Sequence, residues 1–299
     1  MVPETPSAPA AAARASRLGL GTAQFGSAYG LANRGGRVTP ERVRAILLAA
    51  NAAGAAVLDT APAYGDAEQV LGDLGAASAA FAVVTKTAVG AGPAAVRAQL
   101  LRSLARLGRP VADALLVHDR RELLADDGPA LWAALEAVRD EGLARRIGVS
   151  VYHPDEALRL ARRLPLQIVQ LPLNVLDQRA VRSGALAELA ARGVEVHVRS
   201  VFLQGLLLMP KTAIPPALAV AAPAVAAFQA CAREHGLTPL AAALGFVLAV
   251  PGVRVAICGV DSLEQLQELL AAAADTVDPA GFAALATENL DIVDPSRWR

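Results

Sequence analysis

Short apolar runs alternate with helix-forming segments along almost the whole chain. Eight runs have the composition of buried strands, and each is followed by one helical segment, except the seventh, which precedes a long loop and two helical segments. Strict alternation of strand and helix requires a parallel sheet. Eight such units in roughly 250 residues fit a closed barrel better than an open doubly wound sheet. No G-x-G-x-x-G follows the first run, which also argues against the open dinucleotide-binding sheet.

We therefore predict an α/β fold: one (β/α)8 (TIM) barrel over residues 17–299, after a flexible, disordered Ala/Pro-rich tail over residues 1–16. No linker divides the series. The first helix has a strong start signal, with Thr39 as N-cap and Pro40 at its first position, and Gly54 ends it. Strands are expected at 17–21, 56–59, 81–85, 113–117, 146–149, 167–171, 195–199 and 254–258. Helices are expected at 40–53, 65–73, 94–107, 129–140, 154–163, 178–192, 217–235, 239–250 and 262–274.

The composition excludes several classes of function. Lys plus Arg equals Asp plus Glu, at 28 each, so we expect no basic surface for nucleic acid or an anionic membrane. No apolar run is long enough to cross a bilayer. Cys231 and Cys258 lack metal-ligand spacing, so we expect no metal site and a cytoplasmic location. The sequence leaves the oligomeric state open.

Three predicted strands end in polar side chains: Asp59, Lys86 and His118, with Tyr64 shortly after Asp59. In a parallel barrel these strand ends share one mouth, where active sites lie. An ammonium beside a tyrosine favours phenolate and lowers the pKa from its ordinary value of about 10, while a carboxylate keeps that ammonium charged. A histidine can hydrogen-bond a carbonyl oxygen. Singly, each side chain has a commoner structural role, but together they predict protonation of an alkoxide as a carbonyl is reduced.

Seven motifs follow one another along residues 18–207: LGLGTAQFG, VLDTAPAYG, VVTK, LLVHD, GLARRIGVS, IVQLPLN and FLQGLL. In sequence and order they resemble the aldo-keto reductase family, and the resemblance extends over residues 17–274. It implies a small-molecule carbonyl substrate and NAD(P)H bound across the strand ends. It also implies a catalytic tetrad in which Tyr64 is the general acid, Lys86 and Asp59 tune it, and His118 orients the carbonyl.

The resemblance further implies a set of cofactor contacts. Ser150 and Gln170 match positions that hold the nicotinamide carboxamide. Phe25 and Tyr29 are expected to line the substrate pocket. The other expected cofactor contacts are Gly21, Thr22, Arg199, Ser200, Phe202, Gly205, Gly259, Ser262 and Gln265.

Three departures from the family pattern concern the cofactor. Val151 stands where the family often has Asn, and Arg199 stands where it usually has a Tyr that stacks on the nicotinamide. Our hypothesis is that Arg199 favours the reduced cofactor or holds an acidic substrate or phosphate. No Lys or Arg occurs between residues 254 and 297, where users of NADP often have one, and Asp261 and Glu264 add negative charge. This favours NAD(H), which has no 2′-phosphate, although Lys211 could still reach the phosphates of the cofactor.

Two other function classes stay open. The barrel could bind a nicotinamide cofactor as a regulatory or sensor protein with little turnover. Arg199 and Val151, which depart from the family pattern, support this alternative. A metal-dependent hydrolase is weakly supported, because His118-Asp119 is the only His–carboxylate pair at a strand end. The sequence does not indicate which carbonyl compound is the substrate.

Overall fold

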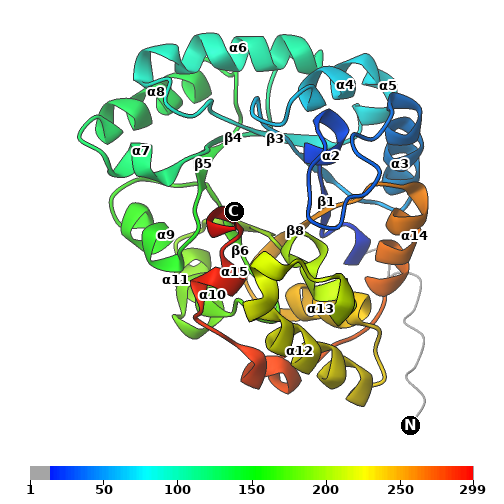
Figure 1. The fold of residues 1–299 in the computed structure, drawn as a ribbon. Coiled ribbons are helices and arrows are strands. Elements are labelled where there is room, and N and C mark those ends of the chain that lie inside the picture. The colour runs from blue at the N-terminus through cyan, green and yellow to red at the C-terminus, as the bar shows by residue number, and fades with distance from the viewer. Residues whose placement is uncertain (1–13, 299) are drawn as a thin grey trace.

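Eight strands close into one parallel barrel (Figure 1). The computed structural model describes residues 14–298, and β1 pairs with both β2 and β8, so the first and last strands complete the cylinder. The predicted (β/α)8 fold is therefore confirmed. The strands are β1 (Leu18–Gly21), β2 (Val57–Asp59), β3 (Ala82–Lys86), β4 (Ala114–Val117), β5 (Ile147–Ser150), β6 (Ile168–Pro172), β7 (Glu195–Arg199) and β8 (Val253–Gly259).

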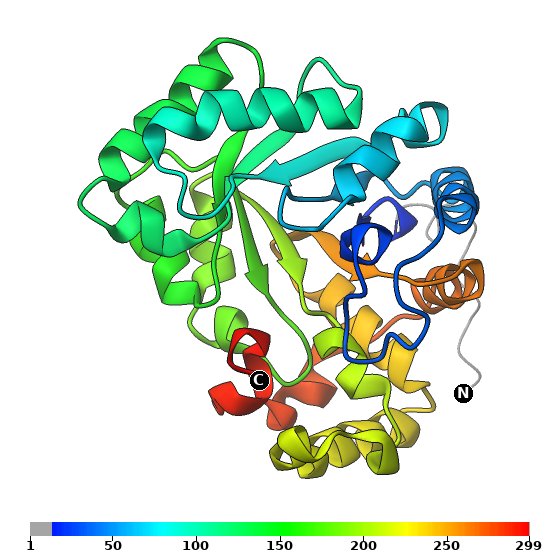
Figure 2. The same ribbon diagram turned by 45° about the horizontal axis from the view of Figure 1, so that its top comes forward.

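The helices form a ring outside the strands, as the two ribbon views show (Figures 1 and 2). The α-helices are α2 (Ala23–Gly26), α3 (Pro40–Ala52), α4 (Ala67–Asp73), α5 (Gly75–Ser78), α6 (Val96–Leu107), α7 (Arg120–Leu124), α8 (Gly128–Asp140), α9 (Pro154–Ala161), α10 (Arg179–Arg182), α11 (Ala185–Ala191), α12 (Ala222–Glu234), α13 (Pro239–Ala249), α14 (Leu263–Ala272) and α15 (Leu290–Val293). The 3-10 helices are η1 (Pro93–Ala95), η2 (Leu203–Leu208), η3 (Lys211–Ala213), η4 (Pro216–Ala221), η5 (Pro279–Leu285) and η6 (Pro295–Arg297).

Several helices differ from the sequence prediction. The helix expected at 178–192 is broken into α10 and α11, because Gly184 adopts a left-handed φ of 74° between them. The helix expected at 217–235 begins as η4 and becomes α-helical only at Ala222. Neither α2 nor α7 was expected, since helices of four or five residues depend on tertiary contacts rather than on their own sequence.

Two layers of apolar packing hold the barrel together. Alternate strand residues point inward, and Val57, Val84, Leu116, Ile168 and Ile257 belong to one cluster that fills the interior. The opposite faces of the strands pack with the helices in a second, larger cluster. The strand ends are therefore rigid supports for any side chain placed on them.

The described part of the chain contacts the barrel at both of its ends. Residues 1–13, most of the predicted tail, fall outside the described residues, and within the rest of that tail Ala15 is buried. The segment after α14 continues to the barrel mouth, where the Thr287 N–H donates to the Leu176 carbonyl oxygen at 2.9 Å. Near the end, the Trp298 indole N–H donates to the Asp291 carbonyl oxygen at 3.1 Å.

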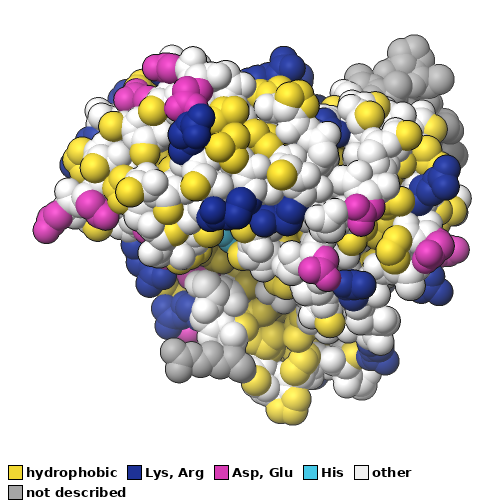
Figure 3. Space-filling model, turned by 90° about the horizontal axis from the view of Figure 1, so that it is seen from above, with side chains coloured by type: hydrophobic (Ala, Val, Ile, Leu, Met, Phe, Trp, Pro, Cys, Tyr) yellow, Lys and Arg dark blue, Asp and Glu magenta, His cyan; other side chains and the backbone are white. Residues whose placement is uncertain are grey.

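Charges of both signs are interspersed on the face shown in Figure 3, which also has a hollow with hydrophobic side chains along it. The sequence analysis expected no apolar run long enough to cross a bilayer, but within residues 14–298 one helical segment, Pro216–Glu234, meets that length and composition, with a mean hydropathy of 1.2. Length and composition alone are weak evidence for a membrane span, because core helices of other proteins pass the same test. This segment changes from 3-10 to α-helix partway along, and Val225 and Phe228 are buried in the core.

Candidate active site

Lys86 and Asp59 form a buried ion pair at the ends of β3 and β2. The Lys86 Nζ lies 2.8 Å from Oδ1 and 2.9 Å from Oδ2 of Asp59, and it donates to the Thr60 carbonyl oxygen at 3.1 Å. The two side chains are only 1% and 6% exposed. Burial disfavours the ammonium, but the adjacent Asp59 carboxylate and Tyr64 together outweigh burial and raise the pKa of Lys86. Lys86 is therefore charged at neutral pH.

Tyr64 lies beside this ion pair, with the Lys86 ammonium 4.9 Å from the centroid of its ring. Burial raises the pKa of the Tyr64 phenol above its ordinary value; the Lys86 charge opposes this rise, and Asp59 adds to it. The sequence-based prediction that the Tyr64 pKa is lowered is therefore wrong, because the phenol is withdrawn from water and Asp59 partly offsets the ammonium. The hydroxyl stays protonated, which is the state that a proton donor requires.

His118 lies edge-on to Tyr64, with the two ring centroids 6.0 Å apart. Burial, assisted by the positive charge of Lys86, lowers the pKa of His118 to about 4. Its Nδ1 is buried and has no partner among the described residues, while its backbone N–H donates to the Thr87 hydroxyl at 3.2 Å. At neutral pH the ring is uncharged and has one N–H with which to donate a hydrogen bond.

Gln170 on β6 connects this cluster to the neighbouring strand end. Its Nε2 donates to Asp59 Oδ1 at 2.8 Å, whereas its Oε1 is buried with no partner among residues 14–298. Ser150 on β5 is in register with Gln170 and is almost buried. An unpaired buried acceptor is costly unless a ligand donates to it. The amide N–H of a nicotinamide carboxamide has the chemistry to satisfy Gln170 in this way.

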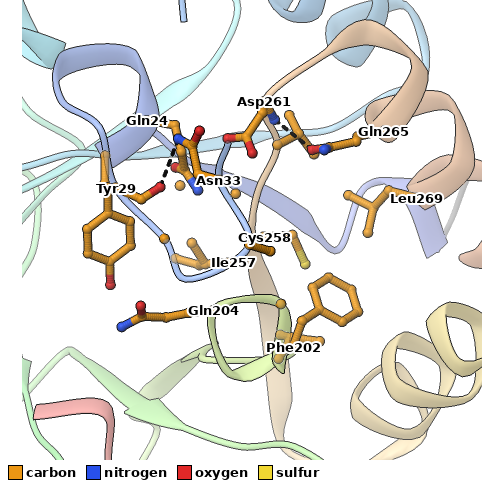
Figure 4. Close-up of a pocket in the computed structure, with 18 of the residues that line it drawn as sticks. Gln24, Tyr29, Asn33, Phe202, Gln204, Ile257, Cys258, Asp261, Gln265 and Leu269 are labelled. Atoms are coloured by element: carbon orange, nitrogen blue, oxygen red, sulfur yellow. Dashed lines mark hydrogen bonds between the residues drawn. The ribbon is translucent and has the colours of Figure 1, made fainter. Parts of the chain in front are cut away.

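A cavity of about 350 Å³ opens beside Tyr64, between the loops that follow β1 and β7 (Figure 4). Asp59 and Tyr64 line one end of it, and Gln265 and Leu269 of α14 line its other end. A cavity of this size lies within the usual range for small-molecule sites. Predicted contacts that line it are Gly21, Tyr29, Arg199, Ser200, Phe202, Gly205, Gly259 and Gln265.

The loop after β7 has an unusual backbone where it borders the cavity. Ser200, Leu203 and Gln204 all adopt left-handed φ angles, of 60°, 47° and 56°. The Gln204 carbonyl oxygen accepts from the Ala32 N–H at 3.2 Å, which joins this loop to the loop after β1. At Gly205, which has a φ of 92°, a Cβ would lie 2.4 Å from the Ala32 Cβ, so only glycine allows this approach.

Arg199, the last residue of β7, crosses toward the end of β5. Its Nη2 donates to the Val151 carbonyl oxygen at 3.1 Å and its Nη1 donates to the Ser200 hydroxyl at 3.3 Å. The Cζ lies 4.1 Å from the centroid of the Tyr152 ring. Arg199 thus occupies the cavity wall in a fixed position. The sequence analysis did not identify Tyr152, because nothing in its surroundings signals this stacking.

The start of α14 forms the far end of the cavity. The Ser262 hydroxyl accepts from the Gln265 N–H at 3.3 Å, and Gln265 Oε1 accepts from the Asp261 N–H at 2.8 Å. Ser262 therefore acts as the N-cap of α14 and does not line the cavity. Asp261 does line it; burial raises the pKa of its carboxyl, and Oδ1 has no partner within the described chain.

Ser150, Gln170 and Ser262 are not among the described residues that line the cavity, and neither are two further predicted contacts, Phe25 and Thr22. Phe25 is fully buried in the core, so the expectation that it lines the substrate pocket is not met; its position in α2 turns it inward. Thr22 is also fully buried, and its hydroxyl donates to the Asp59 carbonyl oxygen at 3.0 Å, which supports the strand end rather than a ligand. The cavity-lining residues that the sequence analysis missed include Gln24, Asn33, Gln204, Leu240 and Cys258.

The aldo/keto reductase family profile matches residues 17–287, nearly all of the described chain. The chain belongs to the aldo/keto reductase family. The family resemblance predicted from the motifs is therefore confirmed, and membership implies NAD(P)H-dependent chemistry on small carbonyl compounds. A search of curated proteins found no match.

Solved aldo-keto reductase structures have the same fold. The holo form of aldo-keto reductase AKR11C1 from Bacillus halodurans has a TM-score of 0.75 and 20% identity, over 94% of this chain and 95% of that one. A putative aldo-keto reductase from Pseudomonas aeruginosa has a TM-score of 0.67 and 24% identity, over 86% and 89% of the two chains. At these identities the likeness establishes the barrel and leaves individual residue roles to be argued from this chain.

Metal ligands do not converge in the part of the chain that the structure describes: no group of three or more His, Cys, Asp or Glu side chains could hold an ion there. The side chains of His118 and Asp119, the pair singled out in the sequence, have no hydrogen-bond partner in common within the described chain. Asp119 accepts from the Arg121 backbone N–H at 3.0 Å as the N-cap of α7.

Proposed function

We propose that this protein reduces an aldehyde or ketone to an alcohol with a nicotinamide cofactor as hydride donor and Tyr64 as general acid. The observation that carries the proposal is the cluster of Tyr64, His118 and the Lys86–Asp59 pair, in which Tyr64 and Asp59 line a cavity and the other two side chains lie against them. The cofactor supplies the hydride to the carbonyl carbon. Ser150 and Gln170 would hold its carboxamide.

The four side chains have distinct roles in this proposal. Tyr64 donates its proton to the carbonyl oxygen as negative charge develops there. Lys86 lies next to the phenol and stabilises the phenolate that remains, and Asp59 keeps Lys86 in place. The neutral His118 donates a hydrogen bond to the same oxygen and orients it. General acid assistance of this kind is worth about 10²–10⁴-fold in rate.

Replacing Tyr64 tests the proposal directly. Tyr64→Phe removes the proton donor but keeps the ring, so we expect rapid mixing of the NADH-loaded protein with 4-nitrobenzaldehyde to oxidise NADH in the wild type and about 10²–10⁴-fold more slowly in the variant. The control is NADH affinity, which the variant should retain. Equal rates in the two proteins would contradict the assignment of Tyr64.

The same experiment separates catalysis from sensing. A regulatory protein that binds a nicotinamide cofactor with little turnover is the second candidate, and it is favoured by Arg199, which occupies a cavity position unusual for the family. In that case NADH would bind the wild type, and no reactive aldehyde would oxidise it.

We also propose a cytoplasmic location, in keeping with two unpaired cysteines, Cys231 and Cys258.

We further propose that the preferred cofactor is NAD(H). Asp261 and Glu268 both line the end of the cavity formed by α14, and no lysine is among its described lining residues. Carboxylates at this position disfavour the extra phosphate of NADP(H). We expect a higher kcat/KM with NADH than with NADPH.

Asp261→Ser should shift this preference toward NADPH by roughly tenfold, because it removes one like-charge repulsion. Glu264→Gln is the matched control, since Glu264 lies on the same helical turn but is exposed and outside the cavity lining. A wild-type protein that already prefers NADPH would overturn the cofactor assignment.

A further inference from the structure

Arg199 gives the wall of the cavity a positive charge that no carboxylate neutralises. It is the one Arg or Lys among the described lining residues, and its two hydrogen bonds go to neutral oxygens of Val151 and Ser200. No Asp or Glu within residues 14–298 forms an ion pair with it. Lys86, in contrast, is paired with Asp59 at 2.8 Å. The catalytic end of the cavity therefore has a net charge of about +1 at neutral pH.

This charge is held in place. The Arg199 Cζ lies 4.1 Å from the centroid of the Tyr152 ring, and both terminal nitrogens donate hydrogen bonds. Moving the guanidinium away from the wall would therefore break three interactions at once. Arg120 also lies near Tyr152, at 5.6 Å from the ring centroid, but Glu156 accepts from its Nε at 3.0 Å. Of the two arginines beside Tyr152, Arg120 is therefore paired with a carboxylate and Arg199, among the described residues, is not.

The Arg199 charge also reaches the groups that would take part in proton transfer. Burial raises the pKa of Tyr64 and lowers that of His118, and the positive charge of Arg199 opposes the first shift and adds to the second. A hydride donor must approach a carbonyl held beside Tyr64. A nicotinamide ring that delivered hydride to such a carbonyl would therefore lie within range of the same fixed charge.

We propose that Arg199 makes the site selective for the reduced, neutral nicotinamide over the oxidised, cationic one. This rests on the proposed function, in which a hydride passes from the reduced ring to the carbonyl carbon and Tyr64 protonates the oxygen, leaving alcohol and oxidised cofactor. Two like charges about 5–10 Å apart, at an effective dielectric constant of about 20, alter affinity by roughly tenfold or more. Repulsion would then speed release of the oxidised product and favour carbonyl reduction over the reverse reaction.

Binding measurements on the full-length protein test this without any carbonyl substrate. Isothermal titration calorimetry gives dissociation constants for NADH, NAD⁺ and ADP-ribose with the wild type, Arg199→Met and Arg199→Lys. We expect Arg199→Met to reduce the preference for NADH over NAD⁺ by roughly tenfold, mainly through tighter NAD⁺ binding. Arg199→Lys, which keeps the charge, should retain most of the preference. Arg120→Met is the matched control and should leave the ratio unchanged.

The remaining outcomes are each decisive. ADP-ribose lacks the nicotinamide ring, so its affinity should be the same in the wild type and Arg199→Met. If Arg199→Met weakens ADP-ribose and both redox forms equally, Arg199 holds phosphate and the inference is overturned. An unchanged NADH to NAD⁺ ratio would also overturn it, while leaving the proposed reductase intact. If folded wild-type protein bound neither redox form, the proposed function itself would fail.

Discussion

At the scale of single residues, the site depends on charges that are buried in compensating pairs. Lys86 and Asp59 are both almost inaccessible to water, and each would be costly to bury alone. Their pairing keeps the ammonium charged beside Tyr64 without adding net charge to the cavity. This is why burial, rather than the ammonium, determines the direction of the Tyr64 pKa shift.

Breaking the pair should therefore destabilise the fold as well as the chemistry. We expect Lys86→Met to lower the free energy of unfolding by about 3–5 kcal/mol, because it leaves the Asp59 carboxylate buried and unpaired. Urea denaturation followed by circular dichroism measures this change. Arg97→Met, which removes an exposed pair with Glu141, is the control and should cost no more than about 1 kcal/mol. Similar losses in the two variants would contradict this account of the pair.

His118 should make folding stability depend on pH. Its folded pKa is about 4, below the value of about 6.5 in an unfolded chain, so between these values the unfolded state binds more protons. Stability contributed by neutral His118 is complete above pH 6.5 and is lost as the pH falls toward 4. The loss amounts to about 3 kcal/mol.

The matched variant for this prediction is His118→Gln, which cannot titrate. The difference in unfolding free energy between wild type and variant should change by about 3 kcal/mol between pH 7 and pH 4. Using the difference removes other titrating groups, such as Glu195, from the comparison. A constant difference across this range would show that His118 is not buried in its neutral form.

At the scale of elements, the loop after β7 shapes the cavity. Its left-handed residues turn the chain back toward the loop after β1, and one backbone hydrogen bond, from Ala32 to Gln204, joins the two loops. The Ser200 carbonyl oxygen also accepts from Asn174 Nδ2 at 3.1 Å, which ties the turn to the segment after β6. The strained turn is thus supported from two sides.

Gly205→Ala should separate these loops and weaken cofactor binding. The new methyl group would meet Ala32 at 2.4 Å, in addition to the strain of a φ of 92°. We expect an NADH dissociation constant at least about tenfold higher, measured by fluorescence titration. Gly236→Ala is the control, because it has a φ of 71° but open space around it, and it should cost only about 1 kcal/mol of stability without affecting NADH. Unchanged affinity in Gly205→Ala would show that the loop contact does not shape the site.

The sequence predicts the strands well because each is a short apolar run that ends at a turn or a polar residue. It also predicts that Asp59, Tyr64, Lys86 and His118 lie close together, since the strand ends of a parallel barrel meet at one mouth. It does not reveal the 3-10 turn at η2 or the stacking of Arg199 on Tyr152. Both depend on contacts between loops that are far apart in the chain, and no local propensity encodes them.

At the scale of the whole molecule, the barrel is completed by contacts between its two ends. Arg17, just before β1, donates to the Leu248 carbonyl oxygen at 2.6 Å and to the Val253 carbonyl oxygen at 2.7 Å. β1 then pairs with β8 over four residues, from Leu18 to Gly21. Closure therefore combines a strand ladder with an arginine that joins the segment before β1 to α13 and β8.

Arg17→Leu should destabilise the whole barrel by about 2 kcal/mol, because two charge-assisted hydrogen bonds to backbone carbonyls are lost. Thermal unfolding followed by calorimetry measures the effect as a single lowered transition. Arg254→Leu on the exposed face of β8 is the matched control, with an expected change within about 0.5 kcal/mol. Equal effects of the two substitutions would show that Arg17 does not contribute to closure.

The pairing of β1 with β8 also has a consequence during synthesis. The ribosome makes about 5–20 residues per second, so β1 emerges roughly 10–50 s before its last neighbour does. For that interval the nascent chain has an open edge at β1, where another polypeptide could add a strand. We therefore expect this protein to depend on chaperones more during translation than during refolding of the complete chain.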